Sequence, residues 1–518
     1  MGSHLQVLIP VILILGAFLI PILDRWFRKL VEPLVICITF SCLVYSCLLL
    51  YGIYLSPLKV FQYFVGFSWN GKIFLPTGEP IGIVLQTDLI GGFILVLVNF
   101  ISFLAAIFSL KYVSRNIPDK KNGIYYTLFL LMTAGMSGIC LTGDIFNLYV
   151  LFEVANLSSY ALVSITGESD AIEASIKYLL ISALASIFIF FGIGLLYSAT
   201  GTLNMSYASN QIRKVLLSGP DTFLFSYRYL IFAALGLFTA GFGIKSALVP
   251  VHGWLPDAHS KAPAPISAML SGLLVKVSGA FLFIRFYFSV FRIQDGLYGD
   301  IFPAFILSAG AITAISGSVF AIAQKKLKRM LAFSTVSQMG YILIGIGFFS
   351  RDGLTGAVLH LFNHSIMKSA LFLSAGAIFY KTKFTRIDEL KGLGFKMPIT
   401  CACFTIASLG IVGIPPMSGF FSKWILGISA IRAGFLPVSA IILLGGLLNA
   451  IYYFRVVGKM YFFNRDPFSV QEPDTNRQEL PKSIYIPIVI LACAVIFFGL
   501  GSDILLKIIR PGVEFLWR

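Results

Sequence analysis

Eight ionisable side chains interrupt otherwise apolar stretches of this sequence, and these are the residues that could do chemistry. They are Glu153, Lys245, His252, Lys276, His360, His364, Lys368 and Lys423. A charged residue at the centre of a membrane helix costs about 2.5–3.5 kcal/mol, so such residues are rare and mark ion pathways by default. Glu, His and Lys all change charge when they gain or lose a proton. The chemistry they predict is therefore proton binding and release.

The deepest of these residues is Lys276. It lies twelve residues into the apolar run 264–291, about 18 Å along a helix, so its side chain cannot reach a membrane surface. Glu153 lies about 12 Å into a run that begins near residue 145. An unpaired carboxylate at that depth would take up a proton, and Lys245 is the candidate partner for an ion pair. The alternative is an inert pair that joins two helices, although buried pairs seldom add net stability.

A second group combines two histidines with a lysine. His360, His364 and Lys368 follow one another at intervals of four residues, so at 100° per residue they share one stripe of one helix. This pattern predicts a hydrated proton-conducting stripe. Satisfied polar packing is one alternative and a haem or metal site is the other. Because the remaining histidines are not suitably placed in pairs on another helix, we expect no metal and no cofactor.

Two of the apolar runs are interrupted close to a lysine. Run 229–261 would be about 50 Å long as one helix, and it contains Lys245 followed by Pro250 and Pro256. Run 398–427 contains Pro415-Pro416 shortly before Lys423. Proline breaks helices, and irregular backbone at membrane depth is tolerated only where it is buried or lines a cavity. Two such breaks in corresponding halves indicate an inverted-repeat transporter.

Four other basic residues lie near the ends of apolar runs, where a long side chain can extend to the membrane surface. We interpret them as snorkelling residues with no part in transport. They are Lys177, Arg285, Arg455 and Lys459.

The composition identifies the class of protein that must position these groups. Apolar residues make up 58% of the 518 residues and charged residues only 12%, which excludes a soluble globular protein. The net charge of +16 comes from basic residues that mostly lie in short loops, as in membrane proteins, so no nucleic-acid partner is expected. The seven cysteines form no CxxC pair or Cys/His cluster, which argues against an iron–sulfur or zinc site.

Apolar runs of about 20 residues predict an all-α polytopic membrane protein with about 14 transmembrane helices. The predicted spans are 5–23, 32–55, 82–109, 124–142, 145–166, 177–199, 229–261, 264–291, 301–323, 327–349, 354–380, 398–427, 432–463 and 483–508. Loops on one side hold 20 Lys and Arg residues and those on the other hold 11. The positive-inside rule therefore predicts a multi-pass protein of the cell membrane with both termini outside.

Several motifs resemble the antiporter-like membrane subunit family. This family includes the large membrane subunits of respiratory complex I, the A and D subunits of Mrp-type sodium/proton antiporters, and matching subunits of archaeal membrane-bound hydrogenases. The motifs are TGDIFNLYVLFE, GFGIKSALVPVHGWLPDAHSKAPAPISAMLSGLLVK, LKRMLAFSTVSQMGYIL, HLFNHSIMKSALF and GIPPMSGFFSKW. The run 175–206 looks most like the Mrp D-type and hydrogenase-type branch.

The resemblance implies a domain organisation. Helices 1–3 would occupy 1–123, a first inverted five-helix repeat 124–291 and a second 301–463. A loop and helix 14 would occupy 464–518. Each repeat would contain one broken helix.

The resemblance also implies roles for individual residues. Glu153 and Lys245 match the family's helix-5/helix-7 ion pair, and Lys276 matches its central helix-8 lysine. The helix-11 histidines match His360 and His364, and the ionisable residue of broken helix 12 matches Lys423. His252 lies where the family often has a histidine beside the helix-7 break. One complex I branch has Glu at the position of Lys423.

The function that follows is a proton-translocating membrane subunit, with Na+/H+ antiport as an alternative form. Protons would pass along Glu153, Lys245, Lys276, the His360/His364/Lys368 stripe and Lys423. The sequence has no redox motif of its own, so it would be the non-redox, ion-pumping subunit of an oxidoreductase complex. Its partners would be Mrp-like small subunits and an electron-transfer module. The alternatives are a free-standing cation/proton antiporter and a membrane subunit that itself binds quinone or haem.

Overall fold

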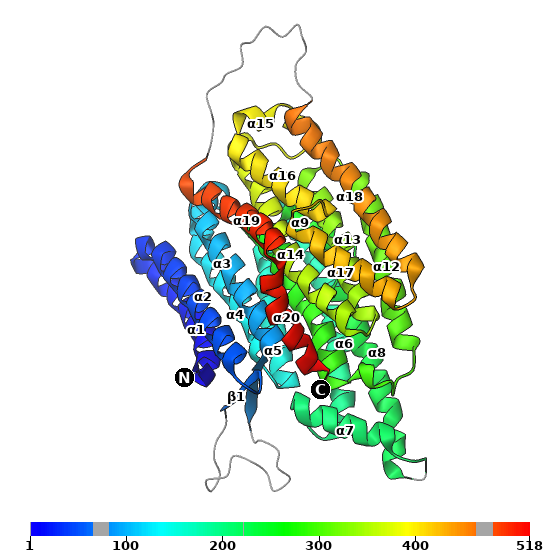
Figure 1. The fold of residues 1–518 in the computed structure, drawn as a ribbon. Coiled ribbons are helices and arrows are strands. Elements are labelled where there is room, and N and C mark those ends of the chain that lie inside the picture. The colour runs from blue at the N-terminus through cyan, green and yellow to red at the C-terminus, as the bar shows by residue number, and fades with distance from the viewer. Residues whose placement is uncertain (1, 66–81, 221, 463–479, 518) are drawn as a thin grey trace, which may run out of the picture.

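The computed structural model describes residues 2–65, 82–220, 222–462 and 480–517. It is a bundle of long helices with both chain termini at the same end (Figure 1). The first half of the bundle contains α1 (Gly2–Trp26), α2 (Val31–Leu55), α3 (Leu89–Asn116), α4 (Asn122–Leu141), α5 (Ile145–Val163), α6 (Ser169–Thr200), α7 (Met205–Leu217), α8 (Arg228–Lys245) and α9 (Trp254–Lys261).

The next helix alternates between α-helical and π-helical geometry. Its segments are α10 (Ala264–Met269), η4 (Leu270–Leu274), η5 (Lys276–Phe281), α11 (Leu282–Ile284) and η6 (Arg285–Val290), of which the three η segments are π-helical. The second half contains α12 (Ile301–Ile322), α13 (Leu327–Gly347), α14 (Arg351–Thr382), α15 (Leu393–Lys396), α16 (Pro398–Val412), α17 (Ser418–Arg432), α18 (Leu436–Tyr461), α19 (Lys482–Leu500) and α20 (Ser502–Leu516).

Short turns of 3₁₀ helix link several of the long helices. They are η1 (Arg28–Leu30), η2 (Asp119–Lys121), η3 (Phe223–Tyr227), η7 (Ile293–Asp295) and η8 (Ile387–Leu390). The predicted loop 464–482 falls largely on residues 463–479, which lie outside the described residues.

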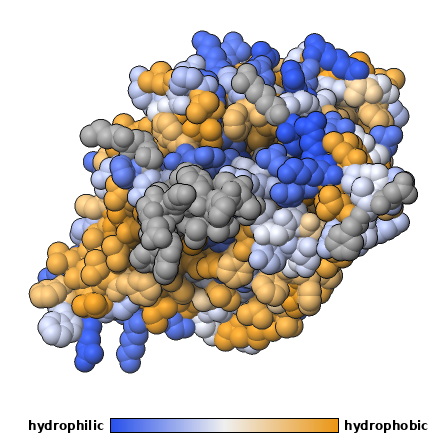
Figure 2. Space-filling model, turned by 90° about the horizontal axis from the view of Figure 1, so that it is seen from below, coloured by the Kyte–Doolittle hydropathy of each residue, from blue (hydrophilic) through white to orange (hydrophobic). Residues whose placement is uncertain are grey.

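Twelve helical stretches in the described part of the chain are long and apolar enough to cross a membrane. This finding confirms the all-α, multi-pass prediction, with fourteen spans as an approximate count. The two predicted spans outside these twelve are 354–380 and 398–427. The first is the polar helix α14, and the second is divided between α16 and α17. Hydrophobic residues cover much of the left and lower rim of the molecule when it is seen from the end that bears the termini (Figure 2).

Both predicted helix breaks are present. Residues 246–253 separate α8 from α9, and Lys245 is the last residue of α8. Residues 413–417 separate α16 from α17, and Gly413 has a φ of +93°. Pro250 in the first break and Pro415-Pro416 in the second lack the amide hydrogen that a continuing helix needs.

Three predicted boundaries are wrong. Residues 83–88 form strand β2 (Ile83–Asp88), which pairs antiparallel with β1 (Val60–Val65), so the third span begins at Leu89 and not at 82. The sixth span begins at Ser169, and the last is divided at Gly501 into α19 and α20. The strand was missed because its alternation is short and runs directly into an apolar helix.

The helix formed by residues 264–290 lies at the centre of the bundle, where it is buried along its whole length. It packs against α14, and Gly272 is needed for this contact because a Cβ there would overlap the Ser369 hydroxyl. α14 is also buried through most of its length, between α13, α16, α17 and α19. These two central helices hold Lys276 and the His360/His364/Lys368 stripe.

Candidate functional site

Four lysines are buried inside the bundle. The exposed fraction is 1% for Lys245, 1% for Lys276, 0% for Lys368 and 9% for Lys423. None of the four forms an ion pair with a carboxylate in the described part of the chain. A buried cation without such a partner depends on neutral hydrogen-bond acceptors and aromatic rings. Those contacts define each of the four sites.

Aromatic side chains surround Lys245. Its Nζ donates a hydrogen bond to the Tyr160 hydroxyl at 3.1 Å. The same atom lies 4.9 Å from the ring centroid of Phe152, 5.5 Å from that of Tyr160 and 5.9 Å from that of Tyr178. Ring faces attract a cation through their negative quadrupole. The site can therefore hold a protonated lysine without a contacting carboxylate.

The predicted direct ion pair between Glu153 and Lys245 is not formed among the described residues. Glu153 accepts a hydrogen bond from the Ser186 hydroxyl of α6 at 2.5 Å, while Lys245 donates to the Tyr160 hydroxyl instead. Because Tyr160 lies two helical turns after Glu153 on α5, it links the two groups along one face of that helix.

Lys276 bonds to its own helix and, through it, to α13. Its Nζ donates to the backbone carbonyl of Ser271, five residues earlier in the π-helical part of the chain. The Ser271 hydroxyl bonds to the Thr335 hydroxyl of α13 at 2.7 Å. π-helical turns are rare and occur often at functional sites.

The Lys368 ammonium reaches the same part of α13. Its Nζ donates to the Ser334 hydroxyl at 2.8 Å, to the Leu331 carbonyl at 2.9 Å and to the Tyr453 hydroxyl at 3.2 Å. Ser334 immediately precedes Thr335, which contacts Ser271 beside Lys276. The sites of Lys276 and Lys368 therefore contact consecutive residues of α13, Thr335 and Ser334.

His360 and His364 lie on α14 as their spacing predicts, with ring centroids 5.9 Å apart and nearly parallel planes. His360 contacts the Ser422 hydroxyl through Nδ1 at 2.9 Å and the Gln338 side-chain oxygen through Nε2 at 3.1 Å. Neither ring nitrogen of His364 has a hydrogen-bond partner within the described residues. His364 is thus a buried group with free capacity to bind a proton or water.

Lys423 lies at the second helix break, next to Ser422. Its Nζ donates to the carbonyl oxygens of Ile411 at 2.6 Å and Val412 at 3.1 Å, which end α16. It also lies 4.9 Å from the ring centroid of Tyr341. The last backbone carbonyls of α16 therefore face this lysine.

His252 and His259 lie at and just after the first helix break, and they differ in burial. His252, in the first break, stacks on Phe320 of α12 with ring centroids 5.5 Å apart, and it contacts none of the four buried lysines among the described residues. His259 on α9 is completely buried, and within the described chain neither of its ring nitrogens has a hydrogen-bond partner. Its ring packs edge-on against Phe372 of α14, one helical turn after Lys368, with ring centroids 5.7 Å apart. Sequence reasoning missed His259 because it falls near the end of a run, where no spacing distinguishes it.

A charged cavity of about 370 Å³ opens beside α9 at the starts of α6 and α13. Its ion pairs join Lys177 to Glu173 at 2.6 Å and Arg329 to Asp257 at 2.9 Å, and join Lys261 to Asp170. His259 belongs to the same short helix as the cavity residues Asp257, Ser260 and Lys261.

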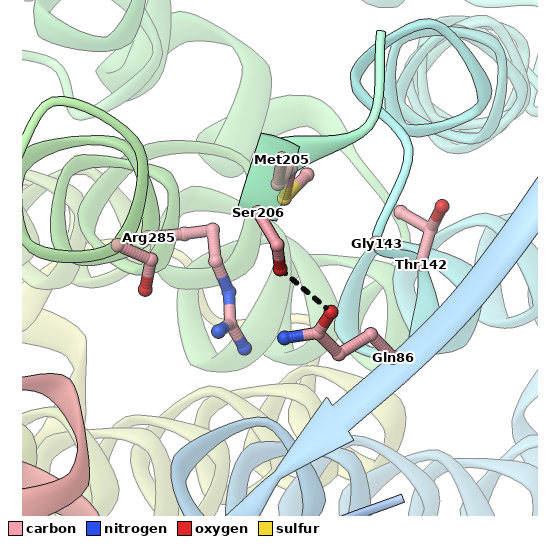
Figure 3. A pocket seen from close by; sticks show the side chains of 7 residues that line it. Gln86, Thr142, Gly143, Met205, Ser206 and Arg285 are labelled. Carbon is pink, nitrogen blue, oxygen red and sulfur yellow. Dashed lines mark hydrogen bonds between the residues drawn. The ribbon is translucent and has the colours of Figure 1, made fainter. Parts of the chain in front are cut away.

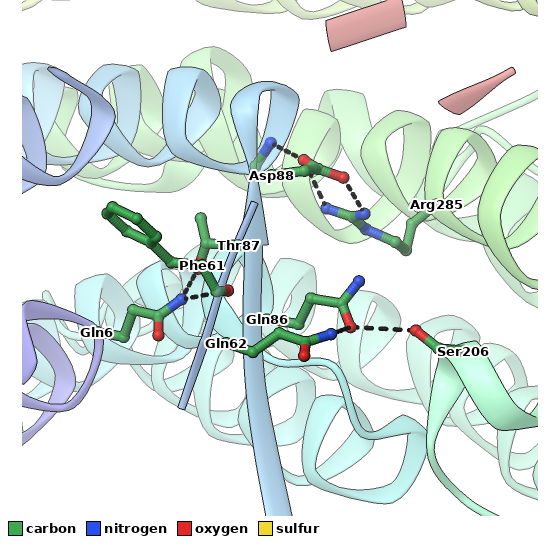
Figure 4. Close-up of polar contacts among 9 residues, drawn as sticks. Gln6, Phe61, Gln62, Gln86, Thr87, Asp88, Ser206 and Arg285 are labelled. Atoms are coloured by element: carbon green, nitrogen blue, oxygen red, sulfur yellow. Dashed lines mark hydrogen bonds and ion pairs between the residues drawn. The ribbon is translucent and has the colours of Figure 1, made fainter. Parts of the chain in front are cut away.

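Arg285 was wrongly interpreted as a snorkelling residue. It is 7% exposed, and its guanidinium forms a two-point contact with Asp88, at 2.5 and 3.2 Å (Figure 4). Asp88 also accepts from the amide of Gly91 and so caps α3. The error arose because the partner is 197 positions away in the sequence, in a segment that was assigned to an apolar span.

A small polar cavity lies next to this ion pair. Gln86, Thr142, Ser206, Ser289 and Arg285 line about 20 Å³ (Figure 3), which is enough for about one water molecule. The Ser206 hydroxyl donates to the Gln86 side-chain oxygen at 3.1 Å. On the other side of the hairpin, Gln6 donates to Thr87 and to the Phe61 carbonyl, which ties α1 to both strands (Figure 4).

We expect Asp88→Asn to destabilise the protein by about 3–5 kcal/mol, because it leaves the buried Arg285 charge without a partner. The melting temperature of the purified protein in detergent measures this loss. Asp88→Leu combined with Arg285→Leu removes both charges and should be less destabilising than Asp88→Asn alone. A double variant that melts below the single one would contradict this account of the pair.

No group of three His, Cys, Asp or Glu side chains is placed to hold a metal ion in the parts of the chain that the structure describes.

Comparisons with known proteins agree on one family. Residues 142–448 match the family described as NADH:quinone oxidoreductase/Mrp antiporter, TM. NADH-quinone oxidoreductase subunit N of Desulforudis audaxviator is 36% identical over 450 residues, which cover 85% of this chain and 86% of that protein. The D subunit of the Na(+)/H(+) antiporter of Alkalihalophilus pseudofirmus is 30% identical over 459 residues, covering 88% and 87%.

Two solved structures are similar over the whole chain. A chain of the Mrp complex from Dietzia sp. is 25% identical, with a TM-score of 0.84, and the match covers 100% of this chain and 97% of that one. A chain of the membrane-bound sulfane sulfur reductase, an archaeal respiratory membrane complex, is 27% identical with a TM-score of 0.86, covering 100% and 98%.

Proposed function

Because the chain belongs to the NADH:quinone oxidoreductase/Mrp antiporter transmembrane family, we propose that it is a proton-translocating subunit of a multisubunit membrane complex. The observation that supports this most strongly is the set of four buried lysines without a contacting carboxylate in the described chain. A protein that needed only stability would gain more from apolar packing at these positions.

The proposed route follows the buried polar and ionisable groups across the bundle, with hydrogen bonds between them over part of its length. It begins at Glu153 and passes through Tyr160 to Lys245 and then to Lys276. The hydroxyls of Ser271, Thr335 and Ser334 lead on to Lys368. His364 and His360 connect Lys368 with Ser422 and Lys423. His259 joins the route between Lys276 and Lys368, and the charged cavity beside α9 is the mouth that connects this region with bulk water.

Coulomb interactions between neighbouring groups are strong enough to drive such a relay. Two unit charges about 5 Å apart interact by about 3 kcal/mol at an effective dielectric constant near 20. Moving one charge against 100 mV requires about 2.3 kcal/mol. Protonation of one lysine can therefore repel a proton from the next. Aromatic rings and carbonyls suit such a relay better than carboxylates in direct contact with the lysines, because a contacting carboxylate would hold each lysine in its protonated form.

The assembly and setting follow from the family and from the charge distribution. We propose that the chain works with small Mrp-like subunits and an electron-transfer module, and that sodium is the second candidate ion. The names of its relatives support both, because they include subunits of a quinone oxidoreductase and of a Na(+)/H(+) antiporter.

Loops on one side of the membrane hold 20 basic residues and loops on the other hold 11. This distribution supports a cell membrane location with both termini outside. The two repeats would be 124–291 and 301–463.

The test of this function is proton transport by the complex in inverted membrane vesicles, followed with a pH-sensitive dye. We expect Glu153→Gln and Lys245→Ala each to reduce transport at least about tenfold, as the loss of a proton-carrying step should. Lys120→Ala is the matched control, because this lysine is exposed in the turn before α4 and lines neither the proposed route nor the charged cavity. Transport above half of wild type in either test variant, at equal membrane abundance, would remove Glu153 or Lys245 from the route.

A further inference from the structure

Lys245 has hydrogen-bonding capacity left inside its aromatic site. A lysine ammonium carries three hydrogens, and one of them is donated to the Tyr160 hydroxyl at 3.1 Å. Within the described residues Nζ forms no second hydrogen bond, and the rings around it offer only the weaker attraction of their faces. Two hydrogens of the ammonium are therefore left for another acceptor.

Helix α5 places a polar group beside this ammonium. Phe152, Asn156 and Tyr160 follow one another at intervals of four residues, so their side chains lie one above the other on a single ridge of the helix. The Lys245 Nζ lies 4.9 Å from the ring centroid of Phe152 and 5.5 Å from that of Tyr160. Because the two outer residues of the ridge both contact Nζ, the middle one, Asn156, faces the same nitrogen.

The side chain of Asn156 is a buried amide. Its exposed fraction is 0%, and neither Oδ1 nor Nδ2 has a hydrogen-bond partner within the described residues. Buried polar groups are nearly always hydrogen-bonded, often to an ordered water molecule. A leucine would fill about the same space without an unpaired polar group. Packing alone therefore does not explain an asparagine at this position.

Glu153 is a second neighbour of this amide. It precedes Asn156 by three residues, so the two side chains are adjacent on the surface of α5. Ser186 bonds to one carboxylate oxygen, Oε1, and among the described residues the other oxygen, Oε2, accepts no hydrogen bond. The Asn156 amide thus adjoins a carboxylate and an ammonium that both have hydrogen-bonding capacity left.

We propose that Asn156 is a positioning residue of the transport route, whose amide holds one water molecule between the Glu153 carboxyl group and Lys245. Oδ1 accepts one hydrogen of this water, and Nδ2 donates to the Glu153 carboxylate. The water closes the gap in the route between Glu153 and the hydrogen-bonded pair of Tyr160 and Lys245. This inference rests on the proposed function, because an amide itself neither gains nor loses a proton.

The step moves one proton and leaves every other bond as it was. The O–H bond of the protonated Glu153 carboxyl group breaks as the water oxygen takes that proton. One of the water's own O–H bonds breaks as the neutral amine of Lys245 takes the other proton. The products are a carboxylate and an ammonium group, and the water is restored. Tyr160 accepts from the same nitrogen and so keeps it beside the ridge.

A sodium ion fits this position less well than water. The amide offers a cation only Oδ1, since Nδ2 is a donor, and a protonated Lys245 would repel a second positive charge at contact distance. Water donates and accepts at the same time, which a relay between a carboxyl group and an amine requires.

The test uses the assembled complex in inverted membrane vesicles and two substitutions of Asn156. Asn156→Leu keeps the approximate size of the side chain and removes both polar atoms. Asn156→Ser restores a donor and an acceptor, and its smaller side chain leaves room for water. We expect at least about a tenfold loss of proton transport for Asn156→Leu and less than about a threefold loss for Asn156→Ser. Equal losses in the two variants would overturn the proposal.

Ser158→Ala is the matched control. Ser158 is also buried on α5, and its hydroxyl donates to the Val154 carbonyl of the same helix at 2.7 Å, so its loss should leave transport near wild type. The melting temperature of the complex separates positioning from packing. Asn156→Leu replaces an unpaired amide by an apolar group of similar shape and should not lower it. Lost transport together with a lower melting temperature would contradict a positioning role.

Electron cryo-microscopy of the wild-type complex tests the water directly. We expect a peak within hydrogen-bonding distance of the Asn156 amide and of the Lys245 Nζ, and no such peak in Asn156→Leu. A wild-type map that resolves other buried waters without this one overturns the proposal. A peak that appears only in sodium-containing buffer overturns it as well, because the occupant would then be a cation.

Failure of this inference and failure of the proposed function give different results. Wild-type transport by Asn156→Leu, while Lys245→Ala is inactive, overturns the role of Asn156 alone. Wild-type transport by both variants at equal membrane abundance contradicts the proposed function too.

Discussion

Lys276→Ala should abolish proton transport, whereas His360→Ala should leave a substantial part of it. Lys276 is the only titratable residue between 264 and 284, so no neighbour on its helix can take over its proton. His360, by contrast, is stacked beside His364, whose ring nitrogens have no hydrogen-bond partner in the described chain. We expect transport in inverted vesicles to fall at least about a hundredfold for Lys276→Ala and less than about tenfold for His360→Ala.

Ser278→Ala is the matched control for this comparison. Ser278 is buried two residues after Lys276, and its hydroxyl donates only to the Leu274 carbonyl of the same helix. This change removes a polar group from the π-helical segment without removing a titratable one, so transport should stay near wild type. If His360→Ala proved more damaging than Lys276→Ala at equal abundance, the histidine stripe and not the central lysine would be the main route.

The sequence was sufficient to predict the bundle and the depth of its charges. Long apolar runs define membrane helices almost by length alone, and proline marks both breaks because it cannot donate a backbone hydrogen bond. The burial of Lys276 follows from its distance to either end of an apolar run. These features are local along the chain, which is why composition and spacing reveal them.

The pairing of the charges could not be predicted in the same way. An apolar helix has no polar face that fixes its rotation, so the direction of the Glu153 side chain toward Ser186 is set only by packing. The Asp88–Arg285 pair joins a strand end to a π-helical segment far along the chain. The burial of His259 depends on how α9 packs back into the bundle after the first break. Such contacts belong to the tertiary structure.

The last predicted span was correct only in part, because the structure divides it into α19 and α20. The sequence predicted one continuous final span, and it contains few enough charges to pass as one. Gly501 divides that span, and the second part, α20, exposes Asp503, Lys507, Arg510 and Glu514 on its outer side. The break has no proline in it, so only the structure distinguishes the apolar α19 from the amphipathic α20.

Lys423→Arg should fold, assemble and fail to transport protons, whereas Lys423→Glu should retain part of the activity. Arg keeps the positive charge that the Ile411 and Val412 carbonyls accept, but its guanidinium is effectively never deprotonated in proteins. A protonated Glu can donate its single hydrogen to one of these carbonyls and later release it. We expect at least about a tenfold loss for Lys423→Arg and a smaller loss for Lys423→Glu.

The opposite order would follow if Lys423 only capped α16. A cap requires a permanent donor near the helix C-terminus, where a positive charge also interacts favourably with the helix dipole. Arg would then replace Lys with little loss, and Glu would be the damaging change because an ionised carboxylate repels the carbonyls. Proton uptake by vesicles with both variants at matched abundance distinguishes the two roles. The melting temperatures of the same variants separate lost transport from lost stability, and a fully active Lys423→Arg would show that this residue carries no proton.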